Sequence, residues 1–281
     1  MWLNIVRRAM VPEPRPVVSD EATLSLDWFN LALAVPLVLV AMALSWWQRL
    51  GLGKSLFIGA VRATVQLLLI GQVLVWLFTT SRWYLVLAVL LVMVVAATLA
   101  ATNRVEQIGS RMSLRFLCGA AILIGSALTM AYLDLVVVNI DPWYDPRYLI
   151  PIFGMIVGNA MNGAALAAER VRSEFETRRD EIEAGLALGA SPAQASARAV
   201  RLAMTAALIP TINALAVVGI VSLPGMMTGQ ILAGADPTQA VHYQLIVMFM
   251  LTSATAITSV LVTVWYRKRF FTQAQQLIDL G

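Results

Sequence analysis

Long apolar stretches separated by short polar ones follow one another along the chain from about residue 28 onward. A helix needs about 20 apolar residues to cross the hydrocarbon core of a bilayer, so windows of that length bounded by charge, Pro, Gly or Asn predict spanning helices. The stretches are far longer than the roughly 10 residues of a membrane β-strand and do not alternate, which favours helices. The pattern therefore predicts an all-α, polytopic membrane protein. Its seven expected spans are residues 28–47, 56–78, 83–101, 116–138, 149–168, 203–222 and 241–266.

The composition supports a membrane protein and excludes several other features. Of the 281 residues, 59% are hydrophobic and 13% are charged, and the mean hydropathy is +0.78. A soluble chain of this composition would expose more apolar surface than water tolerates. The single cysteine, Cys118, excludes an intrachain disulfide. Residues 1–27 hold no apolar stretch ahead of a cleavage site, so we expect no removable signal peptide and a first span that serves as the targeting signal.

Basic residues predict the orientation, because they concentrate in cytoplasmic loops. The loops after spans one, three and five and the C-terminal tail hold fourteen of the twenty Lys and Arg residues. We therefore expect an extracytoplasmic N-terminal segment (1–27), a transmembrane domain (28–266) and a cytoplasmic tail (267–281) in the inner (plasma) membrane. Since topology accounts for the net charge of +4, no nucleic-acid partner is expected.

A charged and then alanine-rich stretch, residues 169–202, separates the fifth span from the sixth and is called the elbow here. Opposite charges four residues apart stabilise a solvated helix, so the fifth span is expected to continue as a helix into the cytoplasm as far as Gly189. Ser191, Pro192 and Gln194 then form a predicted capping box that starts a second helix. The four expected charge pairs are Arg170–Glu174, Arg172–Glu176, Glu174–Arg178 and Arg179–Glu183.

The tip of the elbow is small and apolar from Ala184 to Ala190. Two interpretations remain open from composition: a solvated hairpin that only connects two spans, or a helix tip that docks into a groove of a soluble partner. A solvated turn has no reason to expose such a surface, which favours docking.

The sequence of the elbow resembles the EAA loop by which ABC-transporter permeases contact their ATPase subunits. Glu183, Ala184 and Gly189 match the E-A-A-x-x-x-G core, with Gly185 in place of the second Ala. The I-x-L-P that follows in importers is replaced by Ala-Val-Arg-Leu at residues 199–202. The resemblance implies that the elbow couples to an ATPase through six residues: Glu183, Ala184, Gly185, Leu188, Gly189 and Ser191.

Four longer stretches resemble the iron-export permease family (FetB-like), whose plant relatives are associated with aluminium tolerance. They are residues 59–74, 151–166, 186–196 and 207–244. The resemblance implies a permease domain that works as a homodimer, with two copies of a separate ABC ATPase subunit, to export a metal ion, iron first. ATP and Mg would be bound by that partner, and this chain would hold no cofactor of its own.

The chain itself is not expected to be an ATPase. The stretch "GLGKS" at 51–55 lacks the first glycine of a phosphate-binding loop, because Gln48 stands there. The remaining soluble sequence is too short for a nucleotide-binding domain.

Polar groups at membrane depth mark candidates for the cargo path, because burying them in lipid is costly. Arg62 and Gln66 lie in the second span, where Arg62 either reaches back to the cytoplasmic interface or faces the path. Met155, Asn159 and Asn162 share one face of the fifth span and either join helices or face the cargo, while Gly154 and Gly158 beside them have the spacing of close-packed helices.

A second group of candidates lies near the expected outer side. Leu223-Pro224-Gly225 is expected to break a helix just before Met226 and Met227, and His242 lies near the start of the seventh span. These three side chains either bind a soft metal ion or pack and face the interface. Since no carboxylate cage or Cys/His cluster is visible, the metal assignment depends on the resemblance alone.

Other membrane functions remain as alternatives. An ion-coupled secondary transporter would need acidic groups at mid-depth, and Asp134 is the only carboxylate in the seven windows. An ABC permease for a non-metal cargo such as a nucleotide sugar also stays open. A retinal protein is excluded by the absence of Lys from 241–266, and an intramembrane hydrolase by the absence of its motifs.

Overall fold

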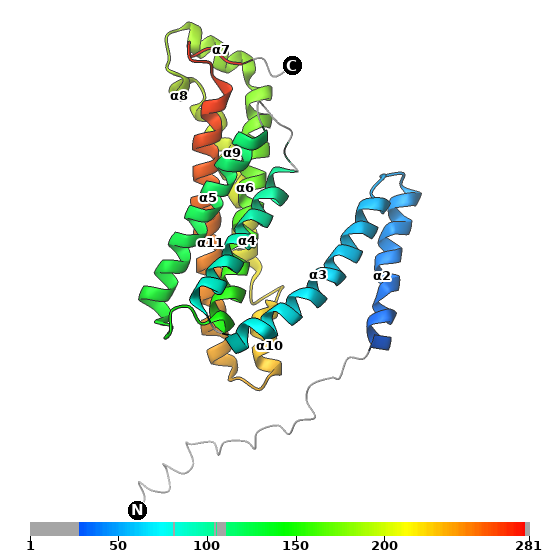
Figure 1. The fold of residues 1–281 in the computed structure, drawn as a ribbon. Coiled ribbons are helices and arrows are strands. Elements are labelled where there is room, and N and C mark those ends of the chain that lie inside the picture. The colour runs from blue at the N-terminus through cyan, green and yellow to red at the C-terminus, as the bar shows by residue number, and fades with distance from the viewer. Residues whose placement is uncertain (1–27, 81, 104, 106–110, 279–281) are drawn as a thin grey trace, which may run out of the picture. The chain divides into compact units, whose positions relative to one another are not determined.

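The computed structural model describes residues 28–80, 82–103, 105 and 111–278. The expected extracytoplasmic segment, residues 1–27, lies outside them. The described residues are helical apart from short loops and isolated bridges, which confirms the all-α prediction (Figure 1). Within the described residues, six helices are long and apolar enough to cross a membrane, and Leu33–Trp47 adds a shorter apolar helix. They overlap the seven predicted spans.

The chain divides into two compact units, and the first comprises the chain through Thr79 together with residues 225–242. It holds α2 (Trp28–Trp47), most of α3 (Gly53–Thr80), α10 (Gly225–Leu232) and the start of α11 (Pro237–Arg267). Large apolar side chains of α2 and α3 are exposed along most of their length. Such surfaces are stable against lipid, not against water.

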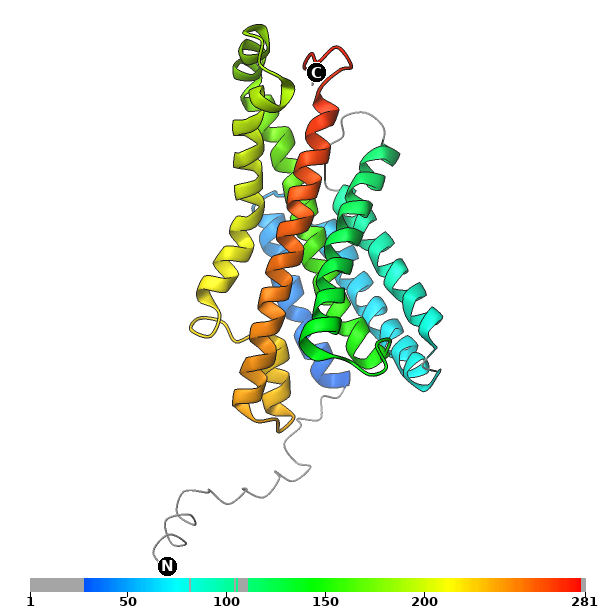
Figure 2. The same cartoon turned by 90° about the vertical axis from the view of Figure 1, so that its left-hand side faces the viewer.

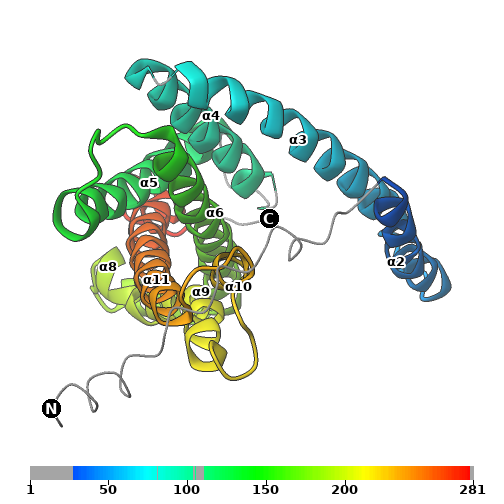
Figure 3. The same cartoon turned by 90° about the horizontal axis from the view of Figure 1, so that it is seen from below.

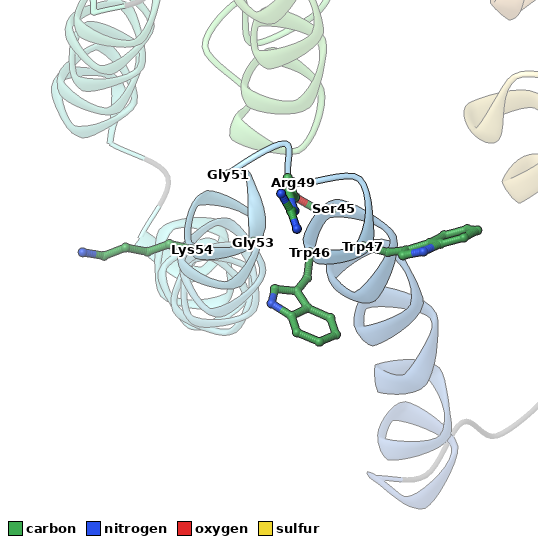
Figure 4. Close-up of a pocket in the computed structure, with 7 residues that line it drawn as sticks. All are labelled: Ser45, Trp46, Trp47, Arg49, Gly51, Gly53 and Lys54. Atoms are coloured by element: carbon green, nitrogen blue, oxygen red, sulfur yellow. The ribbon is translucent and has the colours of Figure 1, made fainter.

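The turn between α2 and α3 is tight. Arg49 and Gly51 have positive φ angles of 53° and 70°, and the Leu52 N–H donates to Ser45 Oγ at 3.1 Å. Trp47 and Lys54 point to opposite sides of this turn, beside a hollow of about 650 Å³ (Figure 4). The "GLGKS" stretch therefore comprises the end of this turn and the first residues of α3.

The second unit holds α4 (Trp83–Thr102), α5 (Arg111–Tyr132) with a π-helical end (Leu133–Val138), α6 (Pro146–Thr177), α9 (Ala197–Val217) and the rest of α11. In Figure 2, α5, α6, α9 and α11 run side by side as a bundle. The centre of that bundle is α6, which packs against α4, α5 and α9. Its alanines at 160, 164 and 167 are fully buried, so the helices approach closely.

Two glycines set the distance of α11 from its neighbours. A methyl group at Gly125 of α5 would clash with Oγ1 of Thr258, and one at Gly163 of α6 would lie 2.8 Å from Oγ of Ser259. The expected pair is only half right: Gly154 approaches Met93 of α4, but nothing lies within 4 Å of a methyl group at Gly158. Glycine at these two positions therefore allows Thr258 and Ser259 of α11 to pack closely against α5 and α6.

The sixth span ends earlier than predicted. We expected a helix to residue 222, but α9 ends at Val217 and a turn follows, in which Gly219 has a φ of 82° and its N–H bonds to the Ser222 carbonyl at 2.9 Å. A left-handed glycine ends a helix at little steric cost, so the chain turns before Pro224 and not at it.

Candidate functional site

The elbow forms two short helices at one end of the second unit (Figure 1). α7 (Arg179–Ala187) follows α6, and α8 (Pro192–Ala195) precedes α9. The expected continuous helix up to Gly189 is wrong in one respect: it is interrupted at Arg178, whose φ and ψ of −111° and 24° are not helical. The interruption lets α7 leave the axis of α6.

Ion pairs tie α7 to both neighbouring helices. Arg178 donates to Glu174 of α6 at 2.9 Å and to Glu181 of α7 at 3.0 Å, and Arg198 of α9 lies 3.4 Å from Glu181. The hydrogen bond from Arg178 holds the pKa of Glu181 below its ordinary value, and the charge of Arg198 adds to this. Glu174 pairs with Arg178 and not with Arg170, whereas the other three expected pairs form.

The predicted capping box is confirmed at the turn between α7 and α8. Gln194 Oε1 accepts the N–H of Ser191 at 2.9 Å, and Ser191 Oγ accepts the N–H of Gln194 at 3.4 Å. Gly189 has a φ of 87°, and the Ala190 N–H donates to the Gly185 carbonyl at 3.0 Å. These bonds satisfy groups that the helix ends leave free, so the turn has one defined shape.

The tip of the elbow, residues 183–191, brings together all six residues expected to contact an ATPase. The Leu188 side chain is 90% exposed, and Glu183, Ala184, Gly189 and Ser191 are also exposed. Gly185 is half-buried and lies close to α8. A methyl group at this position would lie only 3.3 Å from Cβ of Ala195. The departure from Ala at this position therefore allows α7 and α8 to pack tightly.

An aromatic cluster that the sequence did not reveal joins the elbow end of α6 to the C-terminal end of α11. The ring of Phe175 lies 4.3 Å from that of Phe270 and 5.9 Å from that of Phe271, and Tyr266 lies 5.1 Å from Phe270. Phe175, Tyr266 and Phe270 are fully buried. The sequence shows aromatic residues in both segments, but it does not indicate that they contact one another.

A cavity of about 190 Å³ lies between α6, α9 and α11, which are neighbours in the view along the bundle (Figure 3). Of the described residues that line it, none is charged. The polar ones come from all three helices, and a proline and a methionine accompany them. The lining includes Asn159, Asn162, Thr211, Thr252, Thr255, Pro210 and Met248.

The polar groups of this cavity are partly committed to their own helices. Asn159 Nδ2 donates to the Met155 carbonyl at 3.0 Å. The hydroxyls of Thr252 and Thr255 donate at 2.8 Å to the carbonyls four residues earlier. Each hydroxyl has one proton, so both present only acceptor lone pairs to a ligand.

The structure thus unites part of the predicted cargo path. Asn159 and Asn162 line the cavity, while Met155 contributes only its backbone carbonyl to Asn159. On α11, Thr255 is buried and, with Thr252, also lines the cavity. The sequence did not indicate that Pro210 and Thr211 of α9 would also line the cavity.

The remaining candidates belong to the first unit. Arg62 and Gln66 are exposed on α3, and their place in a cargo path stays a prediction. On α10, Met226 is half-buried and Met227 is buried, while His242 is exposed on α11. Among the described residues, no three His, Cys, Asp or Glu side chains group to hold a metal ion, and binding by the two methionines and His242 also stays a prediction.

The elbow and the cavity share their helices. α6 leads from Asn162 at the cavity to its end at Thr177 over 15 residues, or about 22 Å at the rise of an α-helix. α9 leads back from the elbow to Pro210 and Thr211. A displacement of the elbow would therefore reach two walls of the cavity.

A family match and close relatives identify the class of this chain. Residues 28–271 match the uncharacterised protein family UPF0014. The chain belongs to that family. A UPF0014 membrane protein of Synechocystis is 39% identical over 92% of this chain and 99% of its own length. A probable iron export permease protein of Escherichia coli, FetB, is 36% identical over 89% and 94%.

A plant relative and the solved structures complete the comparison. The protein ALUMINUM SENSITIVE 3 of Arabidopsis thaliana is 36% identical over 88% of both chains. No solved structure matches the chain at a significant level. The UPF0014 chain is therefore a multi-pass, all-α membrane protein, and the permease among its relatives supports a transport function.

Proposed function

We propose that this chain is the membrane-spanning permease subunit of an ABC transporter that exports a metal ion, with ATP hydrolysed by a separate subunit. The observation that carries the proposal is the exposed apolar tip of the elbow, which lies between two of the helices that line the cavity. The name of the E. coli relative makes iron the first cargo to test. Two copies of this chain would pair with two ATPase subunits, which bind the ATP and Mg.

The tip suits docking into a groove of a soluble partner. Leu188 projects from it with 90% of its surface exposed, and small residues flank it. An apolar side chain in that position is unfavourable in water and gains free energy when a partner buries it. Gly185 of α7 packs closely against Ala195 of α8, and the ion pairs of Arg178 and Arg198 add to this contact, so a push on Leu188 moves α7 and α8 together.

Closure of the ATPase subunits would then displace α6 and α9 together at their elbow ends. Helices are stiff over the 15 residues from the end of α6 to Asn162, so the displacement changes the cavity walls. Rocking of helices around a central site is the physical basis of alternating access. In this mechanism the permease supplies the path and the ATPase supplies the free energy.

The proposal is tested by co-expressing the chain with a candidate ABC ATPase and measuring ATP hydrolysis and Fe²⁺ transport in vesicles. Gly189→Pro and Glu183→Arg are expected to abolish stimulation of the ATPase while the protein stays folded in the membrane. Glu176→Arg is the matched control, since it also removes an ion pair of four-residue spacing but lies outside the tip. Normal transport by both tip variants would refute the proposal.

The same assay separates the alternatives. An ion-coupled carrier would give transport that follows an ion gradient and no stimulated ATP hydrolysis. A permease for a nucleotide sugar would stimulate hydrolysis with that cargo and not with Fe²⁺.

A further inference from the structure

We propose that Arg115 and Arg269 bind the phosphate group of an anionic phospholipid at the elbow end of the second unit. Arg115 lies near the start of α5, and Arg269 lies in a 3₁₀ turn (Lys268–Phe270) that follows α11. The proposal concerns this chain alone and does not depend on coupling to an ATPase. Its basis is a pair of half-buried cationic side chains for which the described residues supply no counter-charge.

Both guanidinium groups have a buried nitrogen that lacks a hydrogen-bond partner. These atoms are Nε of Arg115 and Nη1 of Arg269. No carboxylate among the described residues forms an ion pair with either side chain. The arginines of the elbow differ, since Arg172, Arg178 and Arg179 each pair with a glutamate. Burial of a cation without a partner is costly, so we expect this pair to bind an anion.

The packing of α5 against α11 brings the two arginines to the same end of the bundle. A methyl group at Gly125 of α5 would lie 3.2 Å from the carbonyl oxygen of Ala254 in α11. One turn earlier on α5 and one turn later on α11, Oγ1 of Thr258 donates to the Ala121 carbonyl at 3.4 Å. The two helices are therefore antiparallel, and the start of α5 and the end of α11 lie at the same end of the bundle (Figure 2).

The charge of Arg269 reaches the face of α5 that carries Arg115. It acts on the thiol of Cys118, which is three residues from Arg115 and therefore on the same face of the helix. The backbone of Arg269 is also held in place, because the next residue, Phe270, is fully buried against Phe175 of α6. Two guanidinium groups placed in this way can share the oxygens of one phosphate group.

The depth of Arg115 favours a lipid phosphate over a soluble anion. The candidate membrane span Arg111–Val138 has no basic residue after Arg115, so this side chain marks the level at which the span leaves the polar surface. Met112 and Phe116 beside it are 70% and 80% exposed, and acyl chains can contact them. The elbow end is expected to be cytoplasmic, and basic sites between transmembrane helices on that side bind anionic headgroups.

An anionic lipid fits this pair better than a zwitterionic one does. Phosphatidylcholine carries its own cation beside the phosphate, and two uncompensated guanidinium groups repel that cation. Phosphatidylglycerol presents a phosphate without such a cation. A lipid bound in this way would hold the end of α11, and with it Phe270, against the start of α5.

The test uses the purified full-length chain in nanodiscs of phosphatidylcholine, with and without phosphatidylglycerol. The measurements are the unfolding temperature and the phosphatidylglycerol that stays bound in native mass spectrometry. We expect phosphatidylglycerol to raise the unfolding temperature of the wild type, because a ligand that binds the folded state stabilises it. Equal stabilisation by inorganic phosphate in phosphatidylcholine nanodiscs would identify a soluble anion as the ligand and overturn the lipid assignment.

The double variant Arg115→Gln/Arg269→Gln assigns the binding to these two residues. Its affinity for phosphatidylglycerol should fall by roughly tenfold or more, and the rise in unfolding temperature should disappear. In phosphatidylcholine alone it should unfold at or above the wild-type temperature, since it no longer buries uncompensated charge. An equal loss of stability in both lipids would indicate a purely structural role and refute the proposal.

The matched control is Arg111→Gln/Lys268→Gln, which removes two exposed charges from the same two elements. It should bind phosphatidylglycerol as the wild type does and keep the rise in unfolding temperature. An equal loss in this control would show that surface charge in general attracts the lipid, and would overturn the assignment to Arg115 and Arg269.

Discussion

The ring centroids of Phe175 and Phe270 lie 4.3 Å apart, and both side chains are fully buried. Phe175 lies near the elbow end of α6, and Phe270 is the last residue of a 3₁₀ turn (Lys268–Phe270) that follows α11. The contact therefore holds α11, which lines the cavity with Thr252 and Thr255, to the elbow end of α6. At the elbow end, this contact links α6 to α11, and the pair of Arg198 with Glu181 links α9 to α7.

Phe270→Ala should loosen this attachment. Truncation of a buried Phe removes its transfer free energy and leaves a cavity, which lowers the free energy of unfolding by about 3 kcal/mol. We expect a lower unfolding temperature in detergent and weaker ATPase stimulation by the coupled complex. Phe116→Ala is the control, because that ring is 80% exposed, and an equal temperature shift in the two variants would contradict the assigned role.

Gly125→Ala tests the close approach of α5 and α11. The added methyl group would clash with Oγ1 of Thr258, and overpacking of this kind destabilises by about 1 to 3 kcal/mol. The second substitution Thr258→Ala removes that oxygen and should restore part of the loss, since the Ala254 carbonyl at 3.2 Å still restricts the space. Thermal unfolding of the four proteins gives the coupling between the two sites as a double-mutant cycle.

Gly158→Ala is the matched control for that experiment. It lies on α6 with nothing within 4 Å of an added methyl group, so its unfolding temperature should stay at or slightly above that of the wild type. Additive effects of Gly125→Ala and Thr258→Ala would show that the two residues do not meet.

Local signals in the sequence were sufficient for the spans and for the elbow turn. Apolar length predicted every spanning helix, because crossing a bilayer constrains each helix independently of its neighbours. The capping box of Ser191 and Gln194 was predictable since both partners lie within one turn of chain. The break at Arg178 was not, because no glycine or proline marks it.

Contacts between distant segments could not be predicted from the sequence. Phe175 and Phe270 lie on different helices, and only the folded bundle brings them together. The sequence did not say that Asn159, Thr211 and Thr252, from three different helices, would line one cavity. A face that packs and a face that lines a cavity have the same composition, so packing geometry decides between them.

Gly189→Ala tests the left-handed turn at the tip. Gly189 has a φ of 87° and nothing within 4 Å of an added methyl group, so the penalty of about 1 to 2 kcal/mol comes from the backbone alone. Gly189→Asn should lose less, because Asn tolerates this conformation better. The measurement is ATPase stimulation together with unfolding temperature, and equal losses for Ala and Asn would indicate a role other than turn geometry.

The pH dependence of the elbow should follow Glu181, whose pKa is lowered first by the hydrogen bond from Arg178 and then by Arg198. A carboxyl with a lower pKa in the folded state stabilises the fold above its unfolded pKa, about 4.3, and that contribution disappears as the pH falls through the lowered folded value. Glu181→Gln should therefore lower the unfolding temperature at pH 7 but not at a pH below the folded value. The effect is small because the pair is exposed. An unfolding difference that grows on acidification would contradict the assigned sign.

Leu188→Cys tests on which side of the membrane the elbow lies. The wild-type chain has one cysteine, Cys118, and it is fully buried, so it should not react with a maleimide that cannot cross membranes. The side chain at 188 is 90% exposed, and a cysteine there should react rapidly wherever the reagent has access. Because basic residues concentrate around the elbow, we expect labelling in inside-out vesicles and none in intact spheroplasts. Labelling of intact spheroplasts would place the tip outside the cell, where no ATPase could reach it, and would remove the basis of the proposed function.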